Sequence, residues 1–149
     1  MGMSLKDTLL GDMKTAMKEK DVLRKNTVQL VRAAILQKEK DQHITLDDEG
    51  ILDVIAKEVK SRRDSLVEFE KGGRQDLVDA ANRELEVLLG YLPRQLSPEE
   101  IEALVKEAIA ETGAESMRDI GRVMAAVRPK TKGVADGKQV NEAAKKLLS

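Results

Sequence analysis

Apolar residues recur every three or four positions along almost the whole chain, the spacing that gathers them on one face of an α-helix. Seven such segments alternate with short stretches of glycine, proline and polar capping residues. Ala, Leu, Val, Glu and Lys dominate the composition, and these residues favour helices. The chain is therefore predicted to be all-α.

The first four predicted helices are long. They are expected to run from Ser4 to Lys20, from Asp21 into the polar residues 38–43, from Thr45 to about Lys71, and from Gly73 to Pro93. Asp21 and Thr45 are the predicted N-caps of the second and third helices. Because only two glycines join the third helix to the fourth, these two helices are expected to form an antiparallel hairpin.

Three shorter helices are predicted to follow. Ser97, Pro98 and Glu100 form a helix-start pattern with a capping box, and this helix is expected to end at Gly113. The next is predicted to begin near Ser116 and to be ended by Pro129. The last spans about Lys138 to Leu148.

The change from long to short helices predicts two domains. Residues 1–96 are expected to form an elongated helical hairpin or bundle unit. Residues 97–149 are expected to form a compact three-helix unit.

The composition narrows the possible chemistry. The chain has no cysteine, which excludes disulfides, thiolate metal sites and cysteine nucleophiles and suits a reducing cytoplasm. No apolar run approaches the roughly 20 residues of a membrane span, and the opening residues do not resemble a signal peptide. We therefore expect a cytoplasmic protein without a membrane partner.

No catalytic or metal-binding constellation is evident. His43 is the only histidine, so a Ser-His-Asp triad, a zinc cluster or a Glu-x-x-His iron motif cannot be assembled. Residues 72–74 lack the spacing of a phosphate-binding loop. We predict no catalytic residue, no metal and no cofactor.

Arg62 occupies a position in the apolar seam of the third predicted helix. Burying a guanidinium without a partner is costly, so a carboxylate is expected nearby. Glu84, on the facing helix, is the predicted partner in a structural ion pair. A ligand contact through Arg62 is the alternative.

The C-terminal quarter is basic although the chain carries a net charge of −1. Residues 114–149 hold eight Lys and Arg against four Asp and Glu. The cations concentrate around a glycine-containing turn, and the candidate phosphate-binding residues are Arg122, Arg128, Lys130, Lys132, Gly133 and Lys138. Together with a helix N-terminus, they suit an anion such as a nucleic-acid backbone. The alternative is a solvated loop rich in lysine.

Several segments resemble the small stand-alone YqeY proteins of bacteria, in the GatB/YqeY family. The most specific are "YLPRQLS" at residues 91–97, "RRDS", "GRQDLV", and the region from Gly121 to Gly137. The resemblance covers essentially the whole chain and implies an all-helical, two-part protein.

The C-terminal part is similar to the tail domain of the B subunit of glutamine-dependent Asp/Glu-tRNA amidotransferase. The matching positions are Gly121, Val123, Met124, Lys132, Gly133, Ala135 and Asp136, where Asp136 replaces the Asn common in those tails. The resemblance implies a tRNA-linked role. The label often attached to the family, carbon-nitrogen ligase with glutamine as amido-N donor, has no residue in this sequence to carry that reaction.

Three hypotheses follow. The leading one is a non-catalytic adaptor that binds structured RNA, foremost tRNA, through its basic C-terminal unit. The second is a protein-interaction module in which the long hairpin presents a helical face. The third is an accessory component that associates with amidotransferase subunits.

Overall fold

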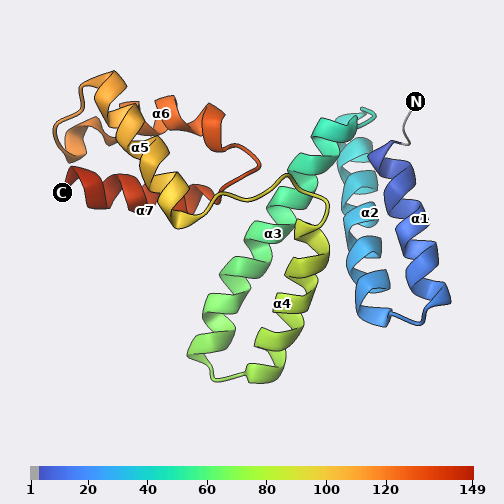
Figure 1. Cartoon of the computed structure of the whole chain (residues 1–149). Helices are drawn as coiled ribbons and strands as arrows, with labels where there is room; N and C mark the ends of the chain where they lie inside the picture. Colours follow the sequence, from blue (N-terminus) through green and yellow to red (C-terminus); the bar gives the residue numbers. More distant parts are fainter. Residues whose placement is uncertain (1–3) are drawn as a thin grey trace. The chain divides into compact units, whose positions relative to one another are not determined.

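The first of two compact units consists of four helices. The structure is a computed structural model that describes residues 4–149. Its first unit, residues 1–92, contains α1 (Leu5–Lys18), α2 (Val22–Gln42), α3 (Asp48–Lys71) and α4 (Gln75–Leu89) (Figure 1). Helix α1 packs along α2, α3 packs along α4, and α2 also contacts both α3 and α4.

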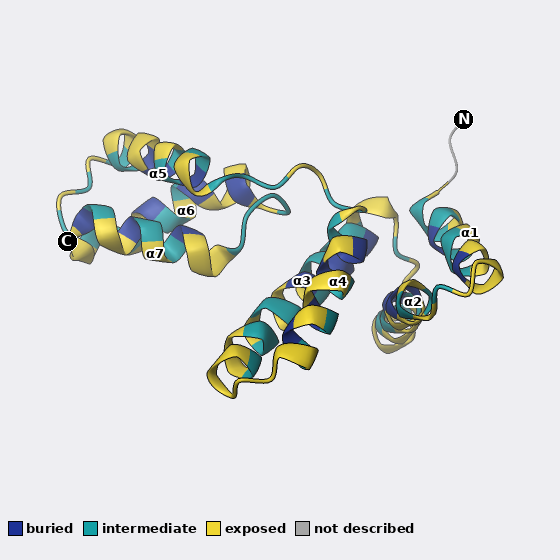
Figure 2. Cartoon of the chain, turned by 60° about the horizontal axis from the view of Figure 1, so that its bottom comes forward, coloured by how far each residue is buried: buried dark blue, intermediate teal, exposed yellow. Residues whose placement is uncertain are grey.

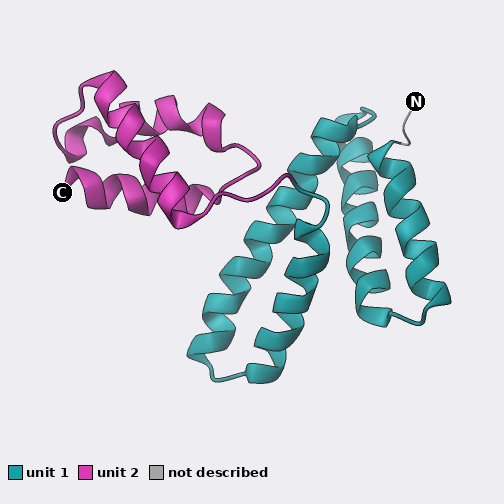
Figure 3. Cartoon of the chain, viewed as in Figure 1, with its two compact units in different colours: residues 1–92 teal, residues 93–149 magenta. Residues whose placement is uncertain are grey.

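The second unit, residues 93–149, is a three-helix arrangement (Figure 3). It contains α5 (Pro98–Thr112), a short 3₁₀ turn η1 (Met117–Asp119), α6 (Ile120–Thr131) and α7 (Gly137–Leu148). Each of the three α-helices packs against the other two. The all-α prediction is confirmed, and none of the helices within residues 4–149 is long and apolar enough to cross a membrane.

The compact units divide between Leu92 and Pro93, whereas the sequence pattern suggested a boundary after Leu96. Leu96 packs against the apolar core of the second unit, and its N–H donates to the carbonyl of Val134 at 2.7 Å. The segment that leads into α5 is thereby held by the second unit itself.

Each unit has its own aliphatic core, drawn in dark blue in Figure 2. The core of the first unit consists of Leu9, Val28, Val31, Ile35, Ile51, Val54, Ile55, Val59, Leu85, Val87 and Leu88. The core of the second consists of Ile101, Val105, Ala108, Val123, Val127, Val140, Ala144 and Leu148. Tyr91 packs on the first core, and its hydroxyl donates to the carboxylate of Asp12 on α1.

Several helix starts follow the capping residues expected from the sequence. Ser4 and Asp21 cap α1 and α2 through their side chains. Ser97 Oγ accepts from the Glu100 N–H at 3.1 Å, and Glu100 Oε1 accepts from the Ser97 N–H at 3.0 Å. The predicted capping box is confirmed.

Three predicted helix boundaries are wrong: the start of the third helix and the ends of the fourth and the sixth. Helix α3 is capped by Asp47, which accepts from the Gly50 N–H at 2.8 Å, and not by Thr45. Helix α4 ends at Leu89, with Gly90 as its C-cap, well before Pro93. Pro129 lies inside α6, which continues to Thr131.

Pro129 is tolerated inside α6 because, at its position, the lost hydrogen bond costs the helix little. Proline lacks an N–H, so one carbonyl a turn earlier loses its helical donor. That carbonyl belongs to Ala125, which is exposed to solvent. The last turn is also supported by the Thr131 hydroxyl, which donates to the Val127 carbonyl at 3.2 Å.

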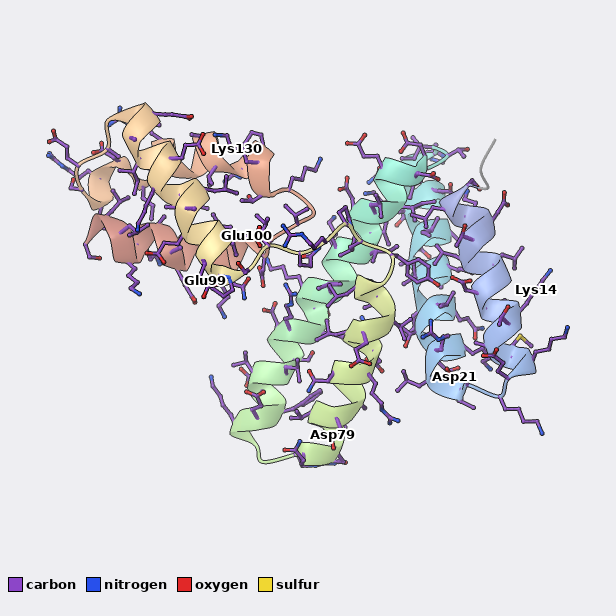
Figure 4. All side chains as sticks on the ribbon, viewed as in Figure 1. Lys14, Asp21, Asp79, Glu99, Glu100 and Lys130 are labelled. Carbon is purple, nitrogen blue, oxygen red and sulfur yellow. The ribbon has the colours of Figure 1, made fainter. Side chains whose placement is uncertain are left out.

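Glu100 makes the stability of the second unit depend on pH. Hydrogen bonds from Arg94, at 2.7 and 2.9 Å, are the main reason that the pKa of Glu100 falls from 4.5 to about 2 (Figure 4). A carboxyl whose pKa is depressed by folding stabilises the fold above its ordinary pKa, and this contribution disappears as the pH falls toward the folded value.

We predict that Glu100→Gln flattens the pH dependence of unfolding between about pH 5 and pH 2. Urea midpoints measured across that range for the parent and the variant test the prediction. Glu99→Gln is the matched control, because Glu99 lies on the same helical turn and its side chain makes no hydrogen bond or ion pair among the described residues. Equal flattening in both variants would contradict the assignment to Glu100.

Candidate nucleic-acid interface

The six candidate phosphate-binding residues do not gather on one face. Because α6 continues through Pro129, Arg128 and Lys130 stand two residues apart on a regular helix. Residues two apart point about 200° away from each other around the axis. Lys130 faces α5, so Arg128 lies on the opposite flank.

Lys130 forms ion pairs within the second unit. Its Nζ lies 3.2 Å from Glu107 Oε1 and 3.4 Å from Glu111 Oε1, both on α5 (Figure 4). The hydrogen bond with Glu107 is the main cause of a raised Lys130 pKa. Lys130 therefore joins α6 to α5, and its charge is largely balanced.

Arg122 also forms an ion pair within the second unit. Its guanidinium lies 2.7 Å from Asp119 Oδ1 and donates to the carbonyl of Thr112 at 3.2 Å. The pKa of Asp119 falls to about 2, chiefly because its carboxylate accepts from the Glu115 N–H and then from Arg122. This cluster fixes the connection from α5 to α6.

Gly133 and Asp136 build the turn between α6 and α7. Gly133 has a φ of 78°, which favours glycine, and its carbonyl accepts from Gln95 Nε2 at 3.0 Å. Asp136 is the N-cap of α7 and accepts from the Lys138 N–H at 3.0 Å. The exposed Lys132 is the C-cap of α6 and begins this turn.

Helix α7 presents cations that the sequence interpretation only partly included. Lys138, Asn141 and Lys145 are spaced so that they share one flank of α7. The other flank borders α5, because a surface hollow there is lined by Pro98 of α5 and by Ala143 of α7 among other residues. The flank with Lys138 and Lys145 therefore lies on the side of α6.

Arg128, Lys138 and Lys145 consequently border the side of the second unit where α6 and α7 meet, and we call these three residues the basic face. Within residues 4–149, none of the three makes an ion pair. Asn141 lies between the two lysines, and its buried Oδ1 lacks a hydrogen-bond partner among the described residues. Lys145 was missed, although its spacing of seven residues from Lys138 was visible in the sequence.

In the first unit, Arg62 is held by two carboxylates. Its Nε lies 3.2 Å from Glu84 Oε2 on α4, and its Nη1 lies 3.1 Å from Glu58 Oε1 one turn earlier on α3. The side chain of Arg62 is only 14% exposed. Through its ion pair with Glu84, Arg62 links α3 to α4.

The lone histidine has a backbone role. His43 has a φ of 53° and is the C-cap of α2, where its N–H donates to the Glu39 carbonyl. Across the described residues, no group of three or more His, Cys, Asp or Glu side chains is arranged to hold a metal.

Comparison with known proteins identifies the family. Residues 6–148 match the family described as Yqey-like protein. This chain belongs to the YqeY-like proteins. Among curated relatives, the Altered inheritance of mitochondria protein 41 of Pyrenophora tritici-repentis is 35% identical over 130 residues, covering 85% of this chain and 71% of that protein.

Two further relatives of this YqeY-like chain carry the same name. Those of Kluyveromyces lactis and Lachancea thermotolerans are 39% and 38% identical, over 67% of this chain in each case. The matched regions span 56% and 55% of those two proteins, so this chain corresponds to little more than half their length.

The names of these relatives correct the expected location. All three are named as mitochondrial proteins, which overturns the expected cytoplasmic location. All three come from fungi, so these comparisons do not support a bacterial origin. None of the three names refers to tRNA or to an amidotransferase.

Proposed function

We propose that this YqeY-like chain is a non-catalytic RNA-binding protein whose second unit holds the phosphates of a structured RNA. The observation that carries the proposal is the basic face: Arg128, Lys138 and Lys145 border the meeting of α6 and α7 and make no ion pair within residues 4–149. The revised site excludes Lys130 and Arg122, whose charges are balanced inside the unit.

The spacing of the basic face suits a phosphate backbone. Lys138 and Lys145 are separated by about 10 Å along the axis of α7, since a helix rises 1.5 Å per residue. Arg128 adds a cation from α6. Long side chains at this spacing can contact successive phosphates of one strand without reading its bases.

Structured RNA, with tRNA as its first candidate, is favoured by the resemblance to the amidotransferase tail. In this chain the matching Lys132, Gly133 and Asp136 form the turn and the cap that set the start of α7. We propose that they position the basic face and that Arg128, Lys138 and Lys145 make the contacts. The mitochondrial names of the relatives make a mitochondrial tRNA the appropriate first probe.

The test is fluorescence anisotropy of a labelled mitochondrial tRNA transcript titrated with the full chain between 50 and 200 mM salt. We predict that Arg128→Ala/Lys138→Ala/Lys145→Ala weakens binding at least tenfold and lowers the salt slope by about 3, because each lost phosphate contact removes about one released counterion.

The matched control is Lys14→Ala/Lys18→Ala/Lys60→Ala, which removes the same charge from exposed positions of the first unit. It should bind tRNA within about twofold of the parent if the basic face is the site. Lys130→Ala should also have little effect. Failure of the parent to bind, or equal losses in the two triple variants, would refute the proposal.

A further inference from the structure

Exposed apolar side chains are concentrated on and beside α2. Seven large hydrophobic residues are exposed within residues 4–149, and five of them lie between residues 17 and 44. They are Met17, Val22, Leu30, Leu36 and Ile44, and Leu36 is the most exposed at 64%. The remaining two, Val67 and Met117, lie on separate elements.

Some of the exposed residues of α2 form a stripe with helical spacing. The α2 stripe consists of Val22, Gln29, Leu30, Ala33, Leu36 and Lys40. Val22, Gln29 and Leu36 repeat every seven residues, and Asn26, Ala33 and Lys40 hold the intervening position, so Val22, Ala33 and Leu36 are the apolar members of the repeat. A helix that lay along this repeat would contact Val22, Ala33 and Leu36, with Leu30 to one side.

The stripe is distinct from the face that α2 buries. The buried face carries Val28, Val31 and Ile35, which belong to the core of the first unit. Leu36 borders two surface hollows, one shared with Lys6 and Leu9 of α1 and another formed with Ala33 and Lys40. An apolar side chain from outside can therefore be received on either side of Leu36.

The charges around the stripe are predominantly positive. Helix α2 carries five cations against only Glu39 and Asp41, but Arg24 pairs with Asp21 at 3.5 Å, and both Arg24 and Lys38 lie by helical spacing on the side of the buried residues. Glu39 is occupied: it accepts from Lys6 Nζ at 2.7 Å and from the Leu46 N–H at 2.8 Å, and the bond from Lys6 is the main cause of its lowered pKa. Lys25 and Arg32 on one flank of the stripe, together with Lys40 within it, therefore form a basic rim.

We infer that the α2 stripe is a docking surface for an acidic amphipathic helix of a partner protein. The helical spacing of Val22, Ala33 and Leu36 fits a helix, these residues and the exposed Leu30 supply its apolar contacts, and the basic rim fits carboxylates on its flanks. A second copy of this chain is disfavoured, because two stripes face to face would bring two positively charged helices together. The inference concerns the first unit and is independent of RNA binding.

The test uses the full chain and a labelled 21-residue peptide with leucine at both heptad seam positions and glutamate on its flanks. The parent should bind this peptide, and a peptide with lysine in place of glutamate should bind at least tenfold more weakly. We predict that Leu30→Ser/Leu36→Ser weakens binding of the glutamate peptide at least tenfold while circular dichroism remains unchanged.

Val67→Ser/Met117→Ser is the matched control, since it changes the two exposed apolar residues outside the stripe. It should leave peptide affinity unchanged, as should the Arg128→Ala/Lys138→Ala/Lys145→Ala variant. If the basic-face variant loses RNA binding but still binds the glutamate peptide, the two surfaces act independently.

Three results would overturn the inference. The first is equal binding of the glutamate and lysine peptides, or binding that Leu30→Ser/Leu36→Ser does not weaken. The second is a dimer in sedimentation velocity that Leu36→Ser dissociates, which would assign the stripe to a second copy. The third is co-sedimentation with anionic vesicles that the double variant abolishes, which would assign it to a lipid surface.

Discussion

Leu88→Ala is expected to lower the free energy of unfolding of the first unit by about 3 kcal/mol. Leu88 lies on α4, is 1% exposed and belongs to the core where α2, α3 and α4 pack together. Alanine removes the apolar contacts of that side chain and leaves a cavity that rigid helices fill only in part. With no tryptophan and a single phenylalanine in the chain, few bulky side chains are available to fill it.

Urea denaturation followed by far-UV circular dichroism measures this loss. Leu89→Ala is the neighbouring control: Leu89 is only partly buried, so its truncation should cost less than half as much. A loss of unfolding free energy below about 1 kcal/mol for Leu88→Ala, or equal losses at the two positions, would mean that Leu88 is not tightly packed in the core.

The helices of this chain were predictable because their signals are local. Ser4, Asp21 and Ser97 cap their own helices within a few residues, so the sequence reveals both the residue and its partner. The start of α3 was misplaced because Thr45 and Asp47 both have capping side chains. The choice of Asp47 also depends on the fold, since Glu39 on α2 accepts from the Leu46 N–H.

The candidate site was less predictable, and one local error explains much of the difference. Taking Pro129 as the end of α6 left the orientations of Arg128 and Lys130 undetermined, so the sequence could not show whether the cations converge on one face. Once the helix continues to Thr131, the two side chains must diverge. A proline in the last turn disrupts too little of the helix to end it.

The remaining difference arises from contacts between helices. Glu107 and Glu111 bind Lys130 from across the α5–α6 interface. Such a pairing depends on how two helices are aligned, and no local spacing encodes that alignment. Lys145 illustrates the converse, because its relation to Lys138 is local and could have been found.

Two separate cores imply a second large effect, at Ile101. This residue is 2% exposed and lies in the core of the second unit, which shares no member with the first core among the described residues. Ile101→Ala is expected to cost about 2–5 kcal/mol. A unit as small as residues 93–149 buries a modest fraction of its surface, so this loss is comparable to its whole stability.

We therefore predict that Ile101→Ala unfolds the second unit selectively. Hydrogen exchange measured by mass spectrometry should show loss of protection across residues 98–148 and retained protection within residues 5–89, because unfolding follows cooperative units. Ile101→Val, which removes a single methyl group, should cost only about 1 kcal/mol and keep the unit folded. tRNA binding should be lost with Ile101→Ala, whereas the glutamate peptide should still bind to α2. Uniform loss of protection in both units would instead show that the two cores unfold as one.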